Sequence, residues 1–123
     1  MGDVMLGKGN LEKAVEYWNA AVEHYPERWQ AYCDRADRFK KLGRYEEALA
    51  DYEKCFDMQE PPRLTDGLYS MAQVHERMGN YAAAIRDRQR IIKCLREEYK
   101  TFSGEAIDCQ KREIERLERK KLG

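Results

Sequence analysis

Apolar side chains recur every three or four residues along most of this chain, which is the period of an amphipathic helix. The pattern predicts helices over residues 11–25, 29–42, 45–58, 65–78 and 81–99. Pro26 follows the first of these and Pro61-Pro62 follows the third, at places where proline commonly ends a helix. We also expect a short helical segment over residues 1–8 and a last helix over residues 106–122. No stretch of the sequence resembles a run of strands.

A short string occurs three times, over residues 9–15, 43–49 and 79–85. Its first residue is Gly9, Gly43 or Gly79, so the spacings are 34 residues (43 − 9) and 36 residues (79 − 43). A period of this length is typical of a solenoid built from repeated helix pairs. We expect each glycine to end a helix in the left-handed conformation. The two additional residues of the second spacing are assigned to the loop 59–63, because a loop accepts an insertion at little cost.

The end of the chain differs from the earlier repeats. No stop signal follows residue 96. The helix that begins near residue 81 is therefore expected to be longer than the second helices of the earlier repeats. Ser103 is the predicted N-cap of the final helix, whose thin apolar stripe consists of Ile107, Ile114 and Leu117. Its other faces are charged, as expected of a helix that caps an array and faces water.

Small and aromatic residues at fixed positions resemble those of the tetratricopeptide repeat family. The middle repeat carries most of the resemblance, with Tyr32, Ala36, Phe39, Gly43, Tyr45, Ala48 and Tyr52, followed by Cys55 and Pro61. The first repeat contributes Gly2, Gly9, Ala14, Trp18, Ala21 and Pro26, and the third contributes Leu68, Met71, Ala72, Gly79, Tyr81 and Ala84. In the third repeat, His75 and Arg88 stand where the family has aromatic residues.

The resemblance implies an all-α fold, a right-handed superhelical array of antiparallel helix pairs. We expect about 2.5 to 3 repeats over residues 1–102: a partial first repeat (1–28), a second (29–62) and a third with an extended second helix (63–102). Residues 103–123 would form the capping helix. The front half of the first helix of the first repeat is missing, so we expect this chain to be part of a longer protein.

Charged residues make up 37% of the chain, but the formal net charge is zero. No bulk field therefore attracts the chain to nucleic acid or to a membrane. The balance conceals an asymmetry, since residues 1–62 hold 9 basic and 13 acidic side chains, and residues 63–123 hold 14 and 10. The four cysteines, Cys33, Cys55, Cys94 and Cys109, have neither a metal-binding spacing nor a close pairing. Such scattered cysteines indicate a reducing compartment, so a cytoplasmic location is expected.

The sequence gives no indication of an enzyme. His24 and His75 are far apart in sequence and lack a matched nucleophile; His24 is expected to be exposed and His75 to occupy a packing position. Gly7-Lys8-Gly9 lacks the spacing and the preceding strand of a phosphate-binding loop. We predict neither a catalytic residue nor a cofactor or metal.

The resemblance implies that the first helix of each repeat lines a concave surface that binds extended peptides. By register, the inward side chains are Asp3, Gln30, Cys33, Asp34, Asp37, Asp66, Tyr69, Ser70, Gln73 and Glu76. Chaperone-binding members of the family hold a terminal carboxylate with lysine, asparagine and arginine, at places occupied here by Asp3, Asp34, Asp66 and Ser70. Aspartates would repel a carboxylate. We therefore expect a basic or amine-bearing peptide or protein, flanked by Lys40, Lys41 and Arg77; the alternative is that the aspartates are solvated surface.

Basic residues also gather over residues 86–96 and 111–121, but acidic residues alternate with them. That alternation is typical of a solvated helix with intrahelical ion pairs, so direct contact with nucleic acid is not expected. The sequence thus predicts a non-catalytic protein-interaction module. Two alternatives remain open: a regulatory domain of a transcription factor whose helix-turn-helix lies upstream, and a structural scaffold that associates with copies of itself.

Overall fold

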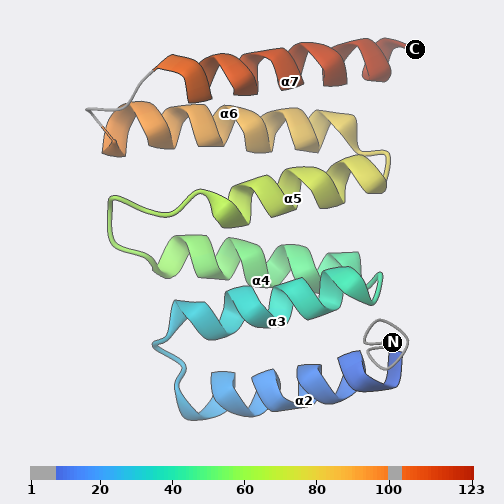
Figure 1. The fold of residues 1–123 in the computed structure, drawn as a ribbon, viewed down its shortest axis with the longest axis vertical. Helices are drawn as coiled ribbons and strands as arrows, with labels where there is room; N and C mark the ends of the chain where they lie inside the picture. The colour runs from blue at the N-terminus through green and yellow to red at the C-terminus, as the bar shows by residue number, and fades with distance from the viewer. Residues whose placement is uncertain (1–7, 100–103) are drawn as a thin grey trace. The chain divides into compact units, whose positions relative to one another are not determined.

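In the computed structural model, residues 8–99 and 104–123 are described, and every regular element within these ranges is a helix. In chain order the helices are α2 (Lys8–His24), α3 (Trp29–Lys41), α4 (Tyr45–Met58), α5 (Asp66–Arg77), α6 (Tyr81–Glu98) and α7 (Gly104–Leu122) (Figure 1). They form two compact units, Met1–Met58 and Gln59–Gly123. The all-α prediction is confirmed.

Two of the three recurring glycines turn the chain as predicted. Gly43 and Gly79 both have a φ of 78°, a left-handed conformation that glycine adopts without steric cost. Each turn is closed by hydrogen bonds back to the preceding helix, including those donated by Arg44 N to Phe39 O (2.9 Å) and by Asn80 N to His75 O (2.8 Å). Asn80 then caps α6, its side chain accepting a hydrogen bond from Ala83 N at 3.2 Å.

The prediction for Gly9 was wrong. Gly9 lies in the first turn of α2, which begins at Lys8, and it has no positive φ. Glycine adopts positive and negative φ values about equally well, so the shared string alone does not determine the conformation of Gly9. The recurring string therefore marks a turn in two of its three occurrences.

The other helix boundaries agree closely with the predictions. The observed α4 matches the predicted range, and α2, α3 and α6 end within one residue of the predicted positions. α7 begins two residues earlier than expected, at Gly104. The two additional residues of the second glycine spacing lie, as predicted, in the loop between α4 and α5. The predicted segment 1–8, apart from the start of α2, and the predicted N-cap Ser103 fall outside the described residues.

In the first unit, α3 and α4 pack through small residues. Ala36 and Ala48 are completely buried, which allows the two helices to approach closely, and Tyr52 beside them is also completely buried. Phe39 and Phe56 fill the remaining space, each only 5% exposed. These are the positions at which the sequence predicted packing residues.

In the second unit, α5, α6 and α7 share a core. Its buried apolar residues on α5 and α6 are Leu68, Met71, Ala72, Val74, Ala83, Ala84, Ile85, Ile91 and Cys94. α7 is attached chiefly by Leu117, which is completely buried against Ala84 and Ile85, with Tyr81 and Ile114 packed around them. Among the described residues, no helix is both long and apolar enough to cross a membrane.

Candidate partner-binding surface

The α3 members of the predicted surface divide into two groups. Gln30 is exposed and Asp34 is half-buried. Cys33 and Asp37 instead contact α4: the thiols of Cys33 and Cys55 are hydrogen-bonded, which raises the pKa of Cys55, and Tyr52 OH donates a hydrogen bond to Asp37 Oδ1. Asp37 and Cys33 therefore help to join the helix pair, whereas Gln30 and Asp34 remain accessible.

Asp34 carries the least compensated acidic group on this helix. Its carboxylate accepts no hydrogen bond from the described residues, although its backbone carbonyl accepts one from Arg38 Nη1 at 3.4 Å. Burial raises the pKa of Asp34; the charge of Arg38 lowers it, and the neighbouring Asp37 raises it again. A partly desolvated carboxylate beside a second carboxylate is a favourable site for an external cation.

The α5 members also differ from one another in their surroundings. Asp66 and Gln73 are exposed, and Ser70 is half-buried. Tyr69 OH accepts a hydrogen bond from Gln110 Nε2 at 2.8 Å, and Arg88 lies 5.5 Å from the Tyr69 ring centre. Burial raises the pKa of Tyr69. Asp3 lies outside the described residues.

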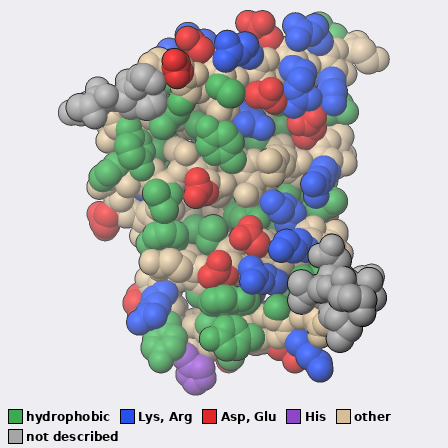
Figure 2. Space-filling model, in the orientation of Figure 1, with side chains coloured by type: hydrophobic (Ala, Val, Ile, Leu, Met, Phe, Trp, Pro, Cys, Tyr) green, Lys and Arg blue, Asp and Glu red, His purple; other side chains and the backbone are tan. Residues whose placement is uncertain are grey.

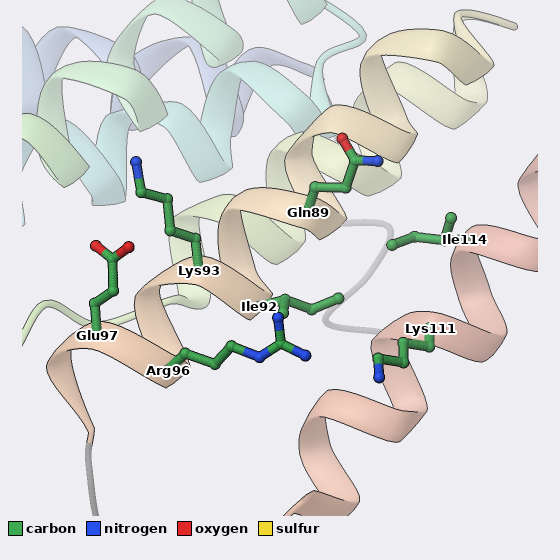
Figure 3. A pocket seen from close by; sticks show the side chains of 7 residues that line it. All are labelled: Gln89, Ile92, Lys93, Arg96, Glu97, Lys111 and Ile114. Carbon is green, nitrogen blue, oxygen red and sulfur yellow. The ribbon is translucent and has the colours of Figure 1, made fainter.

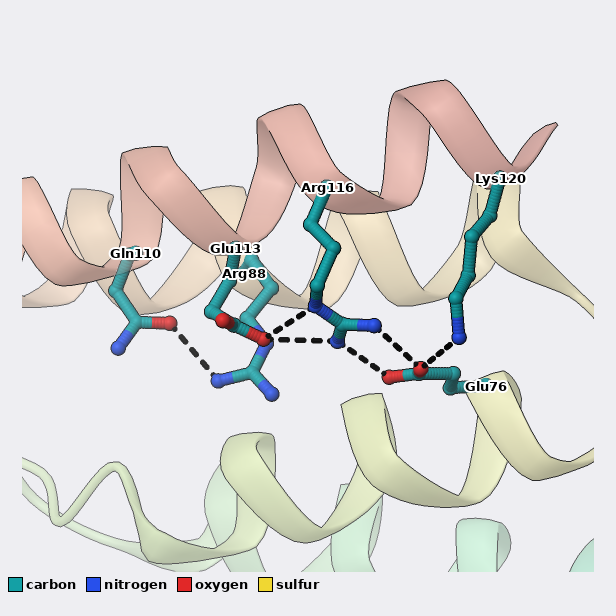
Figure 4. Close-up of polar contacts among 6 residues, drawn as sticks. All are labelled: Glu76, Arg88, Gln110, Glu113, Arg116 and Lys120. Atoms are coloured by element: carbon teal, nitrogen blue, oxygen red, sulfur yellow. Dashed lines mark hydrogen bonds and ion pairs between the residues drawn. The ribbon is translucent and has the colours of Figure 1, made fainter. Parts of the chain in front are cut away.

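Glu76 is neutralised by α7 (Figure 4). Arg116 donates two hydrogen bonds to the Glu76 carboxylate, at 2.8 and 2.9 Å, and Lys120 donates one at 3.2 Å. These bonds lower the pKa of Glu76 to about 2. Close by, Arg88 donates to Gln110 Oε1 at 3.1 Å. The acidic character expected of α5 therefore rests on Asp66 rather than on Glu76.

The contacts that α7 makes with α5 have no signal in the sequence pattern. Gln110 is 1% exposed and joins α6 to Tyr69 of α5, yet nothing in its spacing distinguishes it from the polar residues around it. The alternation of charges over residues 111–121 predicts that Arg116 belongs to a solvated charged face. Its bond to Glu113 at 2.8 Å fits that interpretation, but its bonds to Glu76 span 40 residues. Figure 2 shows the acidic and basic side chains intermingled along α7 at the top of the view.

Both histidines are where the sequence predicted. His24 is exposed at the end of α2, and His75 is buried, with its Nδ1 atom 2.6 Å from Asp87 Oδ2. Burial raises the pKa of Asp87, and the contact with His75 opposes that rise. Within residues 8–99 and 104–123, no three His, Cys, Asp or Glu side chains form a group that could hold a metal ion.

The second unit is expected to lose stability in acid through Glu98. Arg63 binds the Glu98 carboxylate through Nε at 3.0 Å and through its backbone nitrogen at 2.7 Å, and the pKa of Glu98 is lowered to about 2. A lowered folded-state pKa gives stability that is present above the unfolded value, near 4.5, and is lost as the pH falls toward 2.

Thermal unfolding followed by circular dichroism between pH 6 and pH 3 measures this loss. After allowance for solvent screening, we expect the wild type to lose about 1 kcal/mol more than Glu98→Gln over this interval. Equal losses in the two proteins would show that Glu98 does not contribute.

Comparison with known proteins places these helices in one family. Residues 1–54 and 33–92 match the tetratricopeptide repeat. An Hsp70-Hsp90 organizing protein of Triticum aestivum is 27% identical over 122 residues, covering 99% of this chain and 20% of that protein. Hsp70-Hsp90 organizing protein 3 of Arabidopsis thaliana is 28% identical over 92 residues, covering 75% of this chain and 16% of that protein. The chain thus spans only a fifth or less of the length of these two relatives.

Solved structures show the same fold. The TPR2B domain of yeast Sti1, in a complex with pHsp70, has a TM-score of 0.68 at 24% identity. The match covers 97% of this chain and 88% of that chain. The TPR2AB domain of yeast Sti1, in a complex with pHSP90, has a TM-score of 0.70 at 22% identity. The match covers 99% of this chain and 44% of that chain. With the family matched over residues 1–92 and the fold shared with these domains, the chain belongs to the tetratricopeptide repeat family.

Proposed function

We propose that this chain is a non-catalytic protein-interaction module that binds a basic segment of a partner through Asp34 of α3, in the first unit. The observation that carries the proposal is Asp34. It is half-buried, it accepts no side-chain hydrogen bond from the described residues, and burial raises its pKa. A lysine or arginine of a partner would donate a charge-assisted hydrogen bond to this carboxylate.

The family supports a peptide or protein as the partner, because related domains of yeast Sti1 have been solved in complexes with pHsp70 and pHSP90. The charges of this chain favour a different ligand from a terminal carboxylate. Three of the four positions that match the family's carboxylate-binding residues are Asp34, Asp66 and Ser70, and none of these carries a positive charge. A carboxylate placed beside Asp34 or Asp66 would meet repulsion.

In the second unit, α5 carries a smaller acidic surface of its own. Asp66 is exposed in its first turn and Gln73 is exposed two turns later, where it can form hydrogen bonds with a peptide backbone. Glu76 is already bound by Arg116 and Lys120, so we assign it to the attachment of α7 and not to the partner.

Charge reversal at Asp34 tests the proposal. An array of 12-residue peptides with increasing lysine and arginine content would be screened, and the tightest binder measured by fluorescence anisotropy. Asp34→Lys is expected to weaken binding about fivefold, since a partly exposed ion pair contributes up to about 1 kcal/mol.

The matched control is Asp57→Lys, an exposed aspartate on α4 whose replacement changes the net charge equally. We expect this variant to bind almost as tightly as the wild type. The proposal fails if the two variants lose the same affinity, or if the array shows no preference for basic peptides. Sedimentation at several protein concentrations would identify self-association as the alternative.

A further inference from the structure

A groove lies between α6 and α7, on a part of the second unit not used in the proposed function (Figure 3). It has a volume of about 410 Å³ and is lined by Gln89, Ile92, Lys93, Arg96, Glu97, Lys111 and Ile114. The family resemblance assigned no role to any of these side chains.

The floor of the groove is apolar and only half covered. Ile92 of α6 and Ile114 of α7 are both partly exposed, and Ile114 packs against the buried cluster of Ala84, Ile85 and Leu117. The floor is therefore an edge of the core that reaches the surface. Aliphatic side chains of a third element can pack against these two side chains, which come from neighbouring helices.

The rim is basic, and its charges are not compensated. Figure 3 shows Arg96 of α6 directed toward α7 on the side of Lys111. Within the described part of the chain, neither side chain takes part in an ion pair or a hydrogen bond, in contrast to Arg116 on the other face of α7, which binds Glu76 and Glu113. Lys93 and Glu97 lie farther from α7, at the outer edge.

Two cations that line one apolar groove repel each other, and an anion placed with them would relieve the repulsion. The lining holds three basic side chains and one acidic one. The groove also runs between two packed helices, so a helix laid along it would continue the same mode of packing. These features distinguish the groove from the acidic faces of α3 and α5.

We propose that the α6–α7 groove binds an acidic amphipathic helix of a partner protein. Aliphatic side chains of that helix pack on Ile92 and Ile114, and its carboxylates lie with Arg96 and Lys111. The proposal is independent of the proposed function, since it concerns another surface and a ligand of opposite charge.

Three synthetic 18-residue peptides separate the two parts of the proposal. The first is an amphipathic helix with leucine on one face and glutamate on the other. The second has lysine in place of glutamate, and the third has serine in place of leucine. We expect the first to bind about tenfold more tightly than either of the others, as measured by fluorescence anisotropy with the intact chain.

Matched variants place the binding in the groove. Arg96→Gln/Lys111→Gln removes both rim cations, and Arg112→Gln/Arg119→Gln removes two exposed cations of α7 outside the groove with the same change in net charge. The rim variant is expected to bind the leucine–glutamate peptide about tenfold more weakly than the wild type, and the control variant less than about twofold. Circular dichroism establishes that both variants fold.

Several outcomes would overturn the proposal. Equal losses in the two variants would indicate general electrostatic attraction. Failure of the first peptide to bind more tightly than the second would exclude an acidic ligand. A wild type that self-associates without peptide, and a rim variant that does not, would identify a second copy of this chain as the occupant.

Discussion

Leu117→Ala is expected to release α7 from the second unit. Leu117 is completely buried against Ala84 and Ile85, and it is the only apolar residue of α7 that is buried to this degree. Truncating a buried leucine to alanine costs about 2–5 kcal/mol, because transfer free energy is lost and a cavity remains. We expect a loss of about 3 kcal/mol in the free energy of unfolding.

Urea denaturation followed by circular dichroism would measure this loss, and hydrogen exchange would show whether α7 opens before α5 and α6. Leu122→Ala is the control, since Leu122 is on the same helix and is 87% exposed. It is expected to change stability by less than about 0.5 kcal/mol. If both variants lost the same stability, the packing described for α7 would be wrong.

Arg35→Met is expected to cause a comparable loss in the first unit. Arg35 binds Asp51 through two hydrogen bonds, at 2.7 and 2.8 Å, and also donates one to Asn19 at 3.0 Å, so that it joins α2, α3 and α4. The side chains of Arg35 and Asp51 are 20% and 8% exposed. Removing one member of such a pair leaves the other charge uncompensated, at a cost of about 3 kcal/mol.

Arg44→Met is the matched control for Arg35→Met. Arg44 also lies over the Phe39 ring, but its ion pair with Glu47 has side chains 38% and 49% exposed. An exposed pair contributes less than about 1 kcal/mol. The double variant Arg35→Met/Asp51→Leu is expected to recover most of the stability that Arg35→Met loses, because both buried charges are then absent. Thermal and urea unfolding that gave equal losses for Arg35→Met and Arg44→Met would contradict this assignment.

The helices could be predicted because their signals are local. Apolar periodicity located α3, α4 and α6 almost to the residue, and Gly43 and Gly79 turn the chain where the repeats indicated. Gly9 shows the limit of this reasoning. It heads the same string but lies inside a helix, since a glycine permits a left-handed turn without requiring one.

The polar contacts could not be predicted because they depend on how helices distant in sequence are placed against each other. Glu76 was expected to face a partner, yet it binds Arg116, 40 residues later. Arg35 gave one usable signal. It stands directly before the small residue Ala36, at a position where the family commonly has leucine. A charged residue at a packing position requires a partner of opposite charge, here Asp51. Gln110 gave no such signal.

The most direct test of the proposed function is a titration of the isotope-labelled chain with the best basic peptide of the array, followed by amide chemical shifts in two-dimensional nuclear magnetic resonance. We expect the largest shift changes around Gln30 and Asp34 on α3, and we expect these changes to disappear in Asp34→Lys but to persist in Asp57→Lys. Changes concentrated on α6 and α7, or none at saturating peptide, would contradict the proposed function.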